Sequence, residues 1–329
     1  MSAYAAKYKS LFKKEVFKVK KKIFIDGSAG TTGLDIFRRI SGREDIELIT
    51  LSEEKRKDAD ARRDALNSAD IAFLCLPDAA AIESAAMVEN NHTVLLDTST
   101  AHRTDSAWAY GFPELSMAFE EKIKTSKRIA VPGCHASGFI ALIYPLIECG
   151  ALATTAKLSC FSVTGYSGGG KKMIAAYEEE DRDALLGAPR QYALSQKHKH
   201  LPEMQKITGL ENAPIFSPIV SDFYSGMEVT VPIFASDFAE GFGIEEIKKV
   251  YAQKYTGPVV NFVDGGDEEG FLSAGKKSGT DAMEISVFGN EERILLTARY
   301  DNLGKGACGA AIECLNLVLG AELTEGMNV

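Results

Sequence analysis

The feature that most constrains the fold is a short apolar run that ends in a glycine-rich turn and leads directly into a helical pattern. Residues 22–26 read Lys-Ile-Phe-Ile-Asp, which is typical of a short buried strand. The turn at residues 27–33 has a glycine at every third position, and apolar residues recur at helical spacing from there to Ile40. A strand, a glycine-rich turn and a helix in this order predict the beginning of a βαβ unit.

Further apolar runs suggest that this unit continues into a larger sheet. Four of them alternate with helical or loop stretches, at residues 46–51, 71–76, 94–96 and 129–131. This alternation predicts a parallel sheet covered by helices. Beyond residue 155 the strand patterns are longer and suggest antiparallel hairpins, and a final helix is expected to return to the first domain. These later elements are expected at residues 157–164, 228–234, 283–288, 293–300 and 305–319.

Length, charge and cysteine usage narrow the class of protein. At 329 residues the chain is too long for one typical domain, so we expect two. The net charge of -9 argues against binding to nucleic acid or to an anionic membrane, and a small-molecule partner fits better. No apolar run approaches the roughly 20 residues that a membrane-spanning helix needs. The six cysteines form no CxxC pair, which favours a reducing compartment, and we expect a cytoplasmic protein.

The start of the chain differs from the rest in charge. The first 22 residues hold eight lysines and one glutamate. Organelle-targeting peptides favour Arg and Ser, whereas this segment is rich in Lys and almost free of Ser. We interpret residues 1–21 as a solvated basic extension, with a targeting segment as the alternative.

The turn at residues 27–33 predicts a phosphate cradle. Its backbone N–H groups and the N-terminus of the following helix can face a pyrophosphate without a Cβ in the way. The GxxGxxG spacing departs from the usual GxGxxG fingerprint, and a plain strand-to-helix turn is the alternative. The expected cofactor-binding residues in this turn are Gly27, Ser28, Ala29, Gly30, Thr31, Thr32 and Gly33.

Side chains after the second expected strand bear on the choice of cofactor. A carboxylate at this place binds the ribose 2′-OH of NAD, whereas the 2′-phosphate of NADP needs basic and hydroxyl groups. Ser52, Lys55 and Arg56 favour NADP. Glu53 keeps NAD as an alternative, and the run could also be a solvated charge cluster. We place Pro77, which follows the third expected strand, with the cofactor-binding residues.

Cys134 is the candidate nucleophile. It follows a short strand on a glycine-flanked turn and precedes an apolar helical run, so a helix N-terminus would favour its thiolate. A thioester mechanism also needs an acid–base group. His198 and His200 lie just before Glu203, which could orient an imidazole, and the sequence does not distinguish between the two histidines. A zinc site at this pair lacks further ligands nearby, so we expect no metal.

Three loops carry candidate anion-binding groups. One follows the fourth expected strand, at the carboxyl edge of the sheet, where its hydroxyls and an arginine could clamp a phosphate. Another is a second glycine-rich loop that ends in a lysine, for which a plain hairpin turn is the alternative. The third precedes the last helix, where its backbone could meet the nicotinamide or a phosphate, or simply cap the helix. The candidate residues in these loops are Ser99, Arg103, Tyr166, Lys171, Asn302 and Gly304.

Taken together, these motifs resemble the shorter, type 2 subfamily of the N-acetyl-gamma-glutamyl-phosphate reductases. The resemblance runs from about residue 22 to the C-terminus, and the ordered set of motifs is more specific than any one of them. The basic extension departs from the family pattern. The motifs that carry the resemblance are residues 27–33, 97–103, 132–135, 165–171, 198–200 and 302–306.

The resemblance implies an enzyme of arginine biosynthesis that reduces N-acetyl-L-glutamyl 5-phosphate, an acyl phosphate, to the 5-semialdehyde with NADPH. The family's catalytic cysteine falls on Cys134. We expect Cys134 to attack and form a thioester, with inorganic phosphate leaving toward Arg103. The family's acid–base histidine falls within the His198/His200 pair. The resemblance also places Tyr192 and Glu203 near the substrate.

The resemblance further implies a fold like that of glyceraldehyde-3-phosphate dehydrogenase. We expect an NADP-binding Rossmann domain at residues 22–135 and 303–329, and an α+β catalytic and oligomerisation domain at residues 136–302. A homodimer or homotetramer is expected from the same resemblance. The nearest alternative enzyme is aspartate-semialdehyde dehydrogenase, which shares the chemistry but takes a shorter substrate. A catalytically inactive NADP-binding regulator and a cysteine hydrolase without cofactor are alternatives from other classes.

Overall fold

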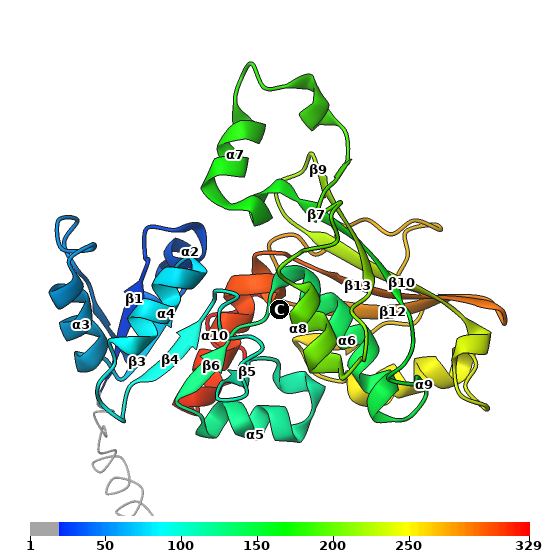
Figure 1. Ribbon diagram of the computed structural model, residues 1–329, viewed down its shortest axis with the longest axis horizontal. Helices are drawn as coiled ribbons and strands as arrows, with labels where there is room; N and C mark the ends of the chain where they lie inside the picture. The colour runs from blue at the N-terminus through cyan, green and yellow to red at the C-terminus, as the bar shows by residue number, and fades with distance from the viewer. Residues whose placement is uncertain (1–19) are drawn as a thin grey trace, which may run out of the picture.

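The computed structural model describes residues 20–329, which form two sheets and a projecting arm (Figure 1). The expected basic extension therefore lies outside the described residues except for its last two positions. The first sheet is parallel throughout, in the order β2-β1-β3-β4-β6-β5. Its strands are β1 (Lys21–Asp26), β2 (Ile46–Ile49), β3 (Ile71–Leu74), β4 (Val94–Asp97), β5 (Ala109–Tyr110) and β6 (Arg128–Ala130).

Helices cover the first sheet on both faces because its strands are apolar on both. Alternate strand residues point to opposite sides, so that Ile23 and Phe73 belong to one buried cluster and Phe24 and Leu74 to another. The first cluster is closed by α2, α5 and α10, and the second by α3 and α4. These helices are α2 (Thr31–Ile40), α3 (Ala59–Ser68), α4 (Asp78–Ala86), α5 (Met117–Thr125) and α10 (Gly309–Leu319), with a short 3₁₀ turn, η1 (Pro113–Leu115), before α5.

The second sheet is mixed and has the order β11-β12-β13-β10-β7-β9-β8. One of its faces packs on α6 and α9, with Val229 and Val231 of β10 in the shared core. Its other face is open except at the end where Thr297 and Arg299 of β13 are buried. The strands are β7 (Ser159–Gly165), β8 (Arg190–Gln191), β9 (Ile215–Ser221), β10 (Met227–Phe234), β11 (Val260–Phe262), β12 (Met283–Gly289) and β13 (Arg293–Tyr300). The helices around it are α6 (Cys134–Glu148), α8 (Leu201–Thr208) and α9 (Ile244–Lys254), with the 3₁₀ turn η4 (Ala235–Asp237).

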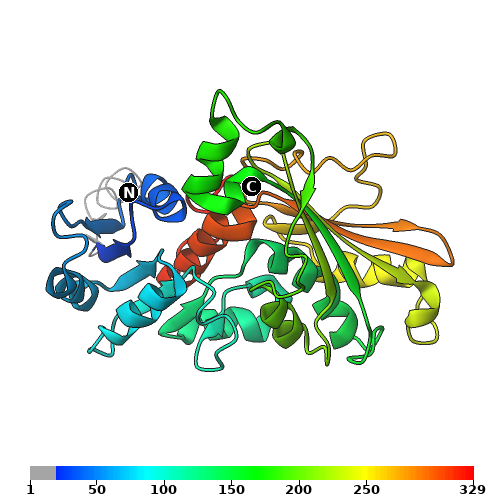
Figure 2. The same cartoon turned by 45° about the horizontal axis from the view of Figure 1, so that its top comes forward.

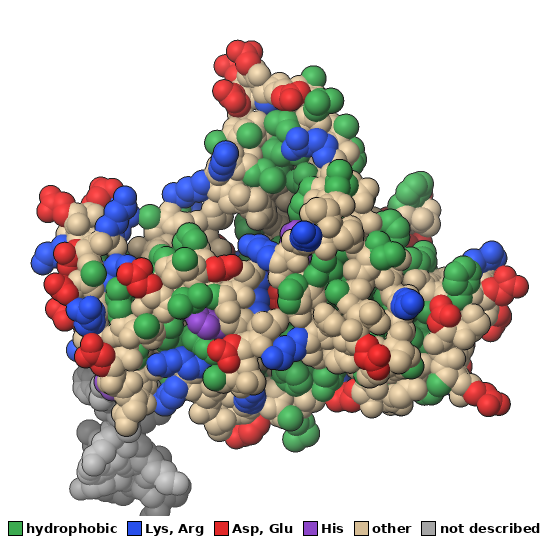
Figure 3. All heavy atoms as spheres, viewed as in Figure 1, with side chains coloured by type: hydrophobic (Ala, Val, Ile, Leu, Met, Phe, Trp, Pro, Cys, Tyr) green, Lys and Arg blue, Asp and Glu red, His purple; other side chains and the backbone are tan. Residues whose placement is uncertain are grey.

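The arm at the top of Figure 1 rises from the second sheet between β7 and β8. It consists of η2 (Tyr166–Gly169), α7 (Gly170–Glu178) and η3 (Ala184–Gly187). A small apolar cluster of Tyr177, Leu186 and Val220 ties it to the sheet. Below the arm the surface is hollowed, and Lys and Arg side chains border the hollow (Figure 3).

The chain returns to the first sheet at its end. After β13, the π-helix η5 (Gly304–Cys308) leads into α10, which lies between the two sheets in both views (Figures 1 and 2). Hydrogen bonds from Gly306 N–H to the Asp301 carbonyl and from Cys308 N–H to the Leu303 carbonyl span five residues, which defines the π-turn. The single helix expected at residues 305–319 is thus divided into two types of helix.

The predicted fold class is confirmed. The first sheet is parallel, and β12 and β13 form the expected antiparallel hairpin, with Met283 opposite Tyr300. Four strands, β5, β8, β9 and β11, were not predicted. Among the described residues, no helix is both long and apolar enough to cross a membrane.

Candidate active site

Cys134 is the first residue of α6, directly after the loop that follows β6. Helix α6 is buried along nearly its whole length, which fixes the position of its first turn. The Tyr300 hydroxyl on β13 donates to the Cys134 carbonyl (2.5 Å) and accepts from the Gly138 N–H (3.0 Å). A Cβ at Gly138 would lie 2.7 Å from that hydroxyl oxygen, so glycine allows this contact between the two elements.

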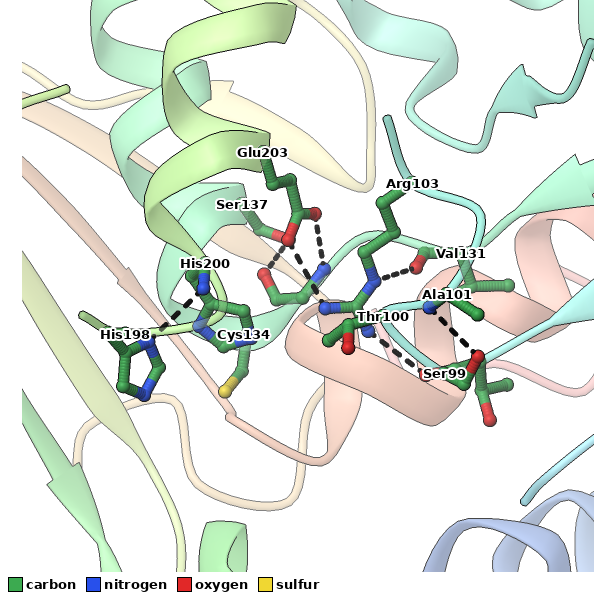
Figure 4. A network of polar contacts seen from close by, with 12 residues as sticks. Ser99, Thr100, Ala101, Arg103, Val131, Cys134, Ser137, His198, His200 and Glu203 are labelled. Carbon is green, nitrogen blue, oxygen red and sulfur yellow. Dashed lines mark hydrogen bonds and ion pairs between the residues drawn. The ribbon is translucent and has the colours of Figure 1, made fainter. Parts of the chain in front are cut away.

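Two cationic or basic side chains converge on Gly133, the N-cap of α6. A Cβ at this residue would lie 2.5 Å from His200 Nε2 and would clash with Arg103 Nη1. Arg103 comes from the loop after β4, and His200 precedes α8. Figure 4 shows both side chains next to the first turn of α6, with His198 beside Cys134.

The two candidate histidines are both neutral. Burial, followed by the nearby Arg103 charge, holds the pKa of His200 well below its usual range. Burial also lowers the pKa of His198, to about 4, with a smaller contribution from Lys199. The His200 backbone N–H donates to His198 Nδ1 (3.3 Å), so neutral His198 carries its proton on Nε2. Of the two rings, that of His200 is the one whose Nε2 lies against Gly133.

The thiol of Cys134 is protonated at neutral pH in the free protein. Burial raises its pKa, and the positive charges of Arg103 and Lys199 offset only part of that effect. The N-terminus of α6 favours the thiolate, as expected, because the His135 backbone N–H also lowers this pKa, but these effects together do not outweigh burial. A neutral imidazole next to a protonated thiol has the proton inventory of an acid–base pair.

Arg103 is held rigidly at the edge of the site. Its Nε donates to the Val131 carbonyl (2.9 Å), Nη2 to the Thr98 carbonyl (3.0 Å) and Nη1 to Glu203 Oε2 (3.2 Å). A guanidinium has five N–H groups, so two remain for a ligand. The side chain also lines the cavity that contains Cys134.

Glu203 does not contact either candidate histidine through its carboxylate. Its Oε1 accepts from the Gly133 N–H (2.8 Å) and from the Tyr110 hydroxyl (2.8 Å), while Oε2 accepts from Arg103. The sequence hypothesis that Glu203 orients an imidazole is therefore wrong. The carboxylate instead fixes the N-cap of the nucleophile helix and the arginine beside it (Figure 4).

The cavity at Cys134 has a volume of about 420 Å³. Among the residues that the sequence assigned to the substrate, it brings together Arg103 and Tyr192. Lys199 and Thr98, which were not predicted, also line it. The position of Lys199 between the two histidines is the signal that would have indicated it.

Three other expected substrate residues lie elsewhere. The Ser99 hydroxyl donates to Asp97 Oδ2 (2.8 Å) and does not line the cavity. Tyr166 stacks on Tyr177 within the arm, at a ring distance of 4.6 Å. Lys171 lines a neighbouring cavity of about 470 Å³, as does Gly304. Spacing in the sequence does not determine which side of a loop faces a cavity, and these three side chains do not face the Cys134 cavity.

A larger cavity of about 950 Å³ lies at the carboxyl edge of the first sheet. Gly27, Ser28 and Ala29 line it, while Thr31 and Thr32 from the same turn line the Cys134 cavity. The turn therefore separates the two cavities and is exposed to both. Gly27 has φ +89°, and a Cβ there would clash with the Cys75 carbonyl, so this position requires glycine. A dinucleotide fits this arrangement, with its pyrophosphate on the N-terminus of α2.

The other expected cofactor residues are distributed around these cavities. Arg56 lines the larger one and contacts Glu53 (2.5 Å), whereas Ser52 and Lys55 do not line it. Pro77 is the N-cap of α4, next to Leu76 in the cavity wall. Asn302 lines the Cys134 cavity, where its amide donates to Ser167 Oγ (2.9 Å).

Solved structures of semialdehyde dehydrogenases have the same fold. Aspartate semialdehyde dehydrogenase II from Vibrio cholerae, complexed with ASA, matches with a TM-score of 0.71 at 16% identity, over 92% of this chain and 98% of that chain. Aspartate semialdehyde dehydrogenase with NADP from Candida albicans matches with a TM-score of 0.62 at 13% identity, over 92% and 99%. These identities support the fold alone.

Family models assign the chain to a class of enzyme. The NAD-binding domain of semialdehyde dehydrogenases matches residues 22–126, and their dimerisation domain matches residues 134–302. The chain is therefore a semialdehyde dehydrogenase with a nicotinamide cofactor domain. N-acetyl-gamma-glutamyl-phosphate reductase from Rhizobium meliloti is 46% identical over 92% of this chain and 100% of its own length, and a Nostoc relative, N-acetyl-gamma-glutamyl-phosphate reductase 2, is 44% identical over 92% and 97%. The chain belongs to the N-acetyl-gamma-glutamyl-phosphate reductase family.

Proposed function

We propose that this enzyme reduces N-acetyl-L-glutamyl 5-phosphate to N-acetyl-L-glutamate 5-semialdehyde with NADPH, through a thioester on Cys134. The observation that carries the proposal is the shared cavity of Cys134, neutral His200 and Arg103, separated from the cofactor-sized cavity only by the turn at residues 27–33. The names of the relatives supply the substrate.

In the first half of the reaction His200 accepts the thiol proton as Cys134 Sγ attacks the acyl carbon. The bond between that carbon and the phosphate oxygen breaks, and phosphate leaves. The two free N–H groups of Arg103 and the ammonium of Lys199 stabilise the charge on the leaving group. The N-terminus of α6 faces the oxygen that becomes negative in the tetrahedral state.

In the second half NADPH, when bound, supplies the hydride that adds to the thioester carbon. His200, protonated in the first half, gives its proton to the oxygen of the resulting thiohemiacetal. The same nitrogen takes that proton back as the C–S bond breaks, which releases the aldehyde, and then passes the proton to the departing sulfur, which restores the thiol and neutral His200. His198 lines the same cavity, and its neutral ring lies 4.8 Å from that of His200 between centroids.

We further propose NADP over NAD. Arg56, Lys57 and Arg62 line the large cavity beside the end of β2, where a 2′-phosphate would lie. Glu53, the residue that would favour NAD, is paired with Arg56. Arg56 and Lys57, which line this cavity, are therefore proposed to bind the 2′-phosphate, whereas Ser52 and Lys55 do not line it.

A homodimer through the open face of the second sheet is the proposed assembly. The pairing of β7, β9, β10 and β13 places exposed apolar side chains on this one face. They are Phe161, Ile215, Phe234 and Leu295. A surface of this kind fits a second copy of the chain, as the dimerisation-domain match also suggests. The domain limits at residues 135 and 303, the cytoplasmic localisation and a tetramer stay predictions.

The test is phosphate-dependent reduction of NADP⁺ with N-acetylglutamate 5-semialdehyde, compared with aspartate semialdehyde at matched concentrations. Turnover of the acetylated substrate is expected to vanish in Cys134→Ala. The exposed thiol of Cys149 provides the control, because Cys149→Ala should keep full activity. Turnover of aspartate semialdehyde alone would contradict the proposed substrate, and a Cys134→Ala enzyme with normal turnover would contradict the thioester.

A further inference from the structure

His135 follows the nucleophile in α6, and the mechanism above does not use it. Its ring is buried, with 3% of the residue exposed. Nδ1 lies 2.6 Å from Ser162 Oγ on β7, and Nε2 lies 2.6 Å from Tyr192 Oη. The ring therefore links a strand in the interior to a side chain in the wall of the Cys134 cavity.

The ring is neutral, so its two hydrogen bonds must run in opposite senses. Burial, with smaller contributions from the neighbouring His198 and Lys199, lowers the pKa of His135 to about 3. A neutral imidazole has one N–H and one lone pair. Either Nδ1 donates to Ser162 and Nε2 accepts from Tyr192, or Nδ1 accepts from Ser162 and Nε2 donates to Tyr192.

Ser162 decides between these two arrangements. Its residue is fully buried, and within the described part of the chain the only hydrogen-bond partner of its hydroxyl is His135 Nδ1. If Nδ1 carried the proton, the Ser162 hydroxyl hydrogen would have no acceptor in a dry interior, which is costly. Tyr192 has no such restriction, because it is half-buried and lines the cavity. The buried serine thus donates to Nδ1, and the proton of the imidazole resides on Nε2.

We propose that His135 is a positioning residue. Its Nε2–H donates to the Tyr192 oxygen, so the hydroxyl hydrogen of Tyr192 points away from His135. The hydroxyl can then donate into the Cys134 cavity, toward an oxygen of the acyl substrate. Burial and the nearby Cys134 raise the pKa of Tyr192, so the phenol keeps this proton at neutral pH. The identity of the acceptor rests on the proposed function, whereas the state of the imidazole does not.

The first test measures the protonation of the two ring nitrogens directly. Long-range ¹H–¹⁵N correlation spectra of the full chain, labelled with ¹⁵N-histidine, distinguish a protonated ring nitrogen from an unprotonated one. The signals of His135 are assigned by their loss in His135→Gln, and His92→Gln, which changes an exposed loop residue, provides the control. Protonated Nε2 with unprotonated Nδ1 is the expected result. The opposite pattern would overturn the proposal, whatever reaction the enzyme catalyses.

The second test is kinetic and uses the different reach of two replacement side chains. The amide of Gln extends as far as Nε2 and can still donate to Tyr192, whereas the amide of Asn extends only as far as Nδ1. Tyr192→Phe and His135→Asn are each expected to lower kcat/KM about tenfold, and His135→Gln less than about threefold. Because His135 acts through Tyr192, His135→Asn should have no further effect on the Tyr192→Phe enzyme.

Independent, multiplying losses in the double variant would show that His135 only packs the core and would overturn the proposal. Equal losses in His135→Gln and His135→Asn would do the same. If His135→Asn does not fold, Ser162→Ala replaces it, since it removes the donor to Nδ1 and should allow both protonation patterns in the spectra. A wild-type enzyme without turnover would refute the proposed function, while the spectra would still decide the role of His135.

Discussion

Glu203 connects groups around the nucleophile that are far apart in the sequence. One carboxylate oxygen receives the N–H of Gly133 and the hydroxyl of Tyr110, and the other receives Arg103. The carboxylate and the guanidinium are both buried, so each depends on the other for its charge balance. The geometry of the N-cap next to Cys134 thus depends on an ion pair.

Replacing Glu203 with Ala is expected to lower the free energy of unfolding by about 3–5 kcal/mol, because the Arg103 charge then stays buried without a partner. Glu203→Gln should cost less, since the amide oxygen can still accept from Gly133. Urea unfolding measures both changes. The exposed Glu240 provides the control through Glu240→Ala, and a loss of the same size there would contradict the argument.

The pH dependence of thiol labelling follows from the raised pKa of Cys134. Since burial raises this pKa above 9.0, only the high-pH side of the range contains much thiolate. The rate of iodoacetamide labelling of Cys134, followed by mass spectrometry, should therefore still be rising at about pH 9. Arg103→Met removes the largest compensating charge and should shift the rise to still higher pH. A plateau below about pH 8 would contradict this expectation.

The sequence predicts the site residues whose position follows from local context. It does not predict whether a side chain on a loop points into the cavity. Cys134 and the His198/His200 pair share one cavity, because a strand end and a helix start fix them. Tyr166 and Lys171 lie on an equally suggestive loop but face other parts of the molecule. No spacing rule states which side of a loop faces a cavity.

Among the elements, the π-helix η5 lies against the nucleophile. A Cβ at Gly306 would be 3.0 Å from Cys134 Cβ. The adjacent Lys305 is buried and contacts Glu114 (2.7 and 2.8 Å) as well as Glu313. Burial raises the pKa of Glu313, so this carboxyl keeps a proton beside the ammonium. A buried cation therefore anchors the turn that borders Cys134.

Lys305→Met should lower the free energy of unfolding by about 3–5 kcal/mol, since the charge of Glu114 loses its partner. The double variant Lys305→Met/Glu114→Gln should recover part of that loss because it removes the unpaired charge. Both are measured by urea unfolding, and a double variant that is less stable than Lys305→Met would contradict the account.

The limits of sequence reading for elements have physical causes as well. The pattern at residues 305–319 is helical throughout, and only the buried lysine and the five-residue hydrogen bonds reveal the π-turn. Strand β9 was missed although it is continuous through Pro218, whose carbonyl accepts from the Tyr192 N–H (3.0 Å). The alternation of strands and helices in the first half could be predicted because both faces of that sheet are covered, so its strands are apolar throughout.

For the whole molecule, buried histidines make stability depend on pH. The pKa of His135, His198 and His200 is lower in the folded chain than the ordinary value of 6.5. The unfolded chain then binds more protons below pH 6.5, so stability is lost as pH falls below that value. Each fully buried histidine contributes a loss of about 1.4 kcal/mol per pH unit.

Urea unfolding at about pH 7 and about pH 5 checks this dependence. The slope should be smaller in His135→Gln and unchanged in His92→Gln, which removes an exposed histidine. Equal slopes in all three proteins would contradict the assignment.

The assembly prediction belongs to the same scale. Phe161→Lys or Phe234→Lys on the open face of the second sheet should convert the proposed dimer to a monomer in light scattering. Leu185→Lys, on the equally exposed arm, should leave the dimer intact. A dimer that persists in both sheet variants would show that the interface lies on another surface.

The contacts of Glu203 also determine how this architecture can be taken apart. Its helix, α8, belongs to the second half of the chain, whereas Arg103 and Tyr110 belong to the first. A chimera that joined the cofactor-binding half of one relative to the other half of a distant one would have to carry this set of side chains together. The two halves are therefore not independent modules, because the contacts of Glu203 with Arg103 and Tyr110 join them. Recombination that separates these residues should yield proteins that bind cofactor but hold the Cys134 thiol in the wrong position.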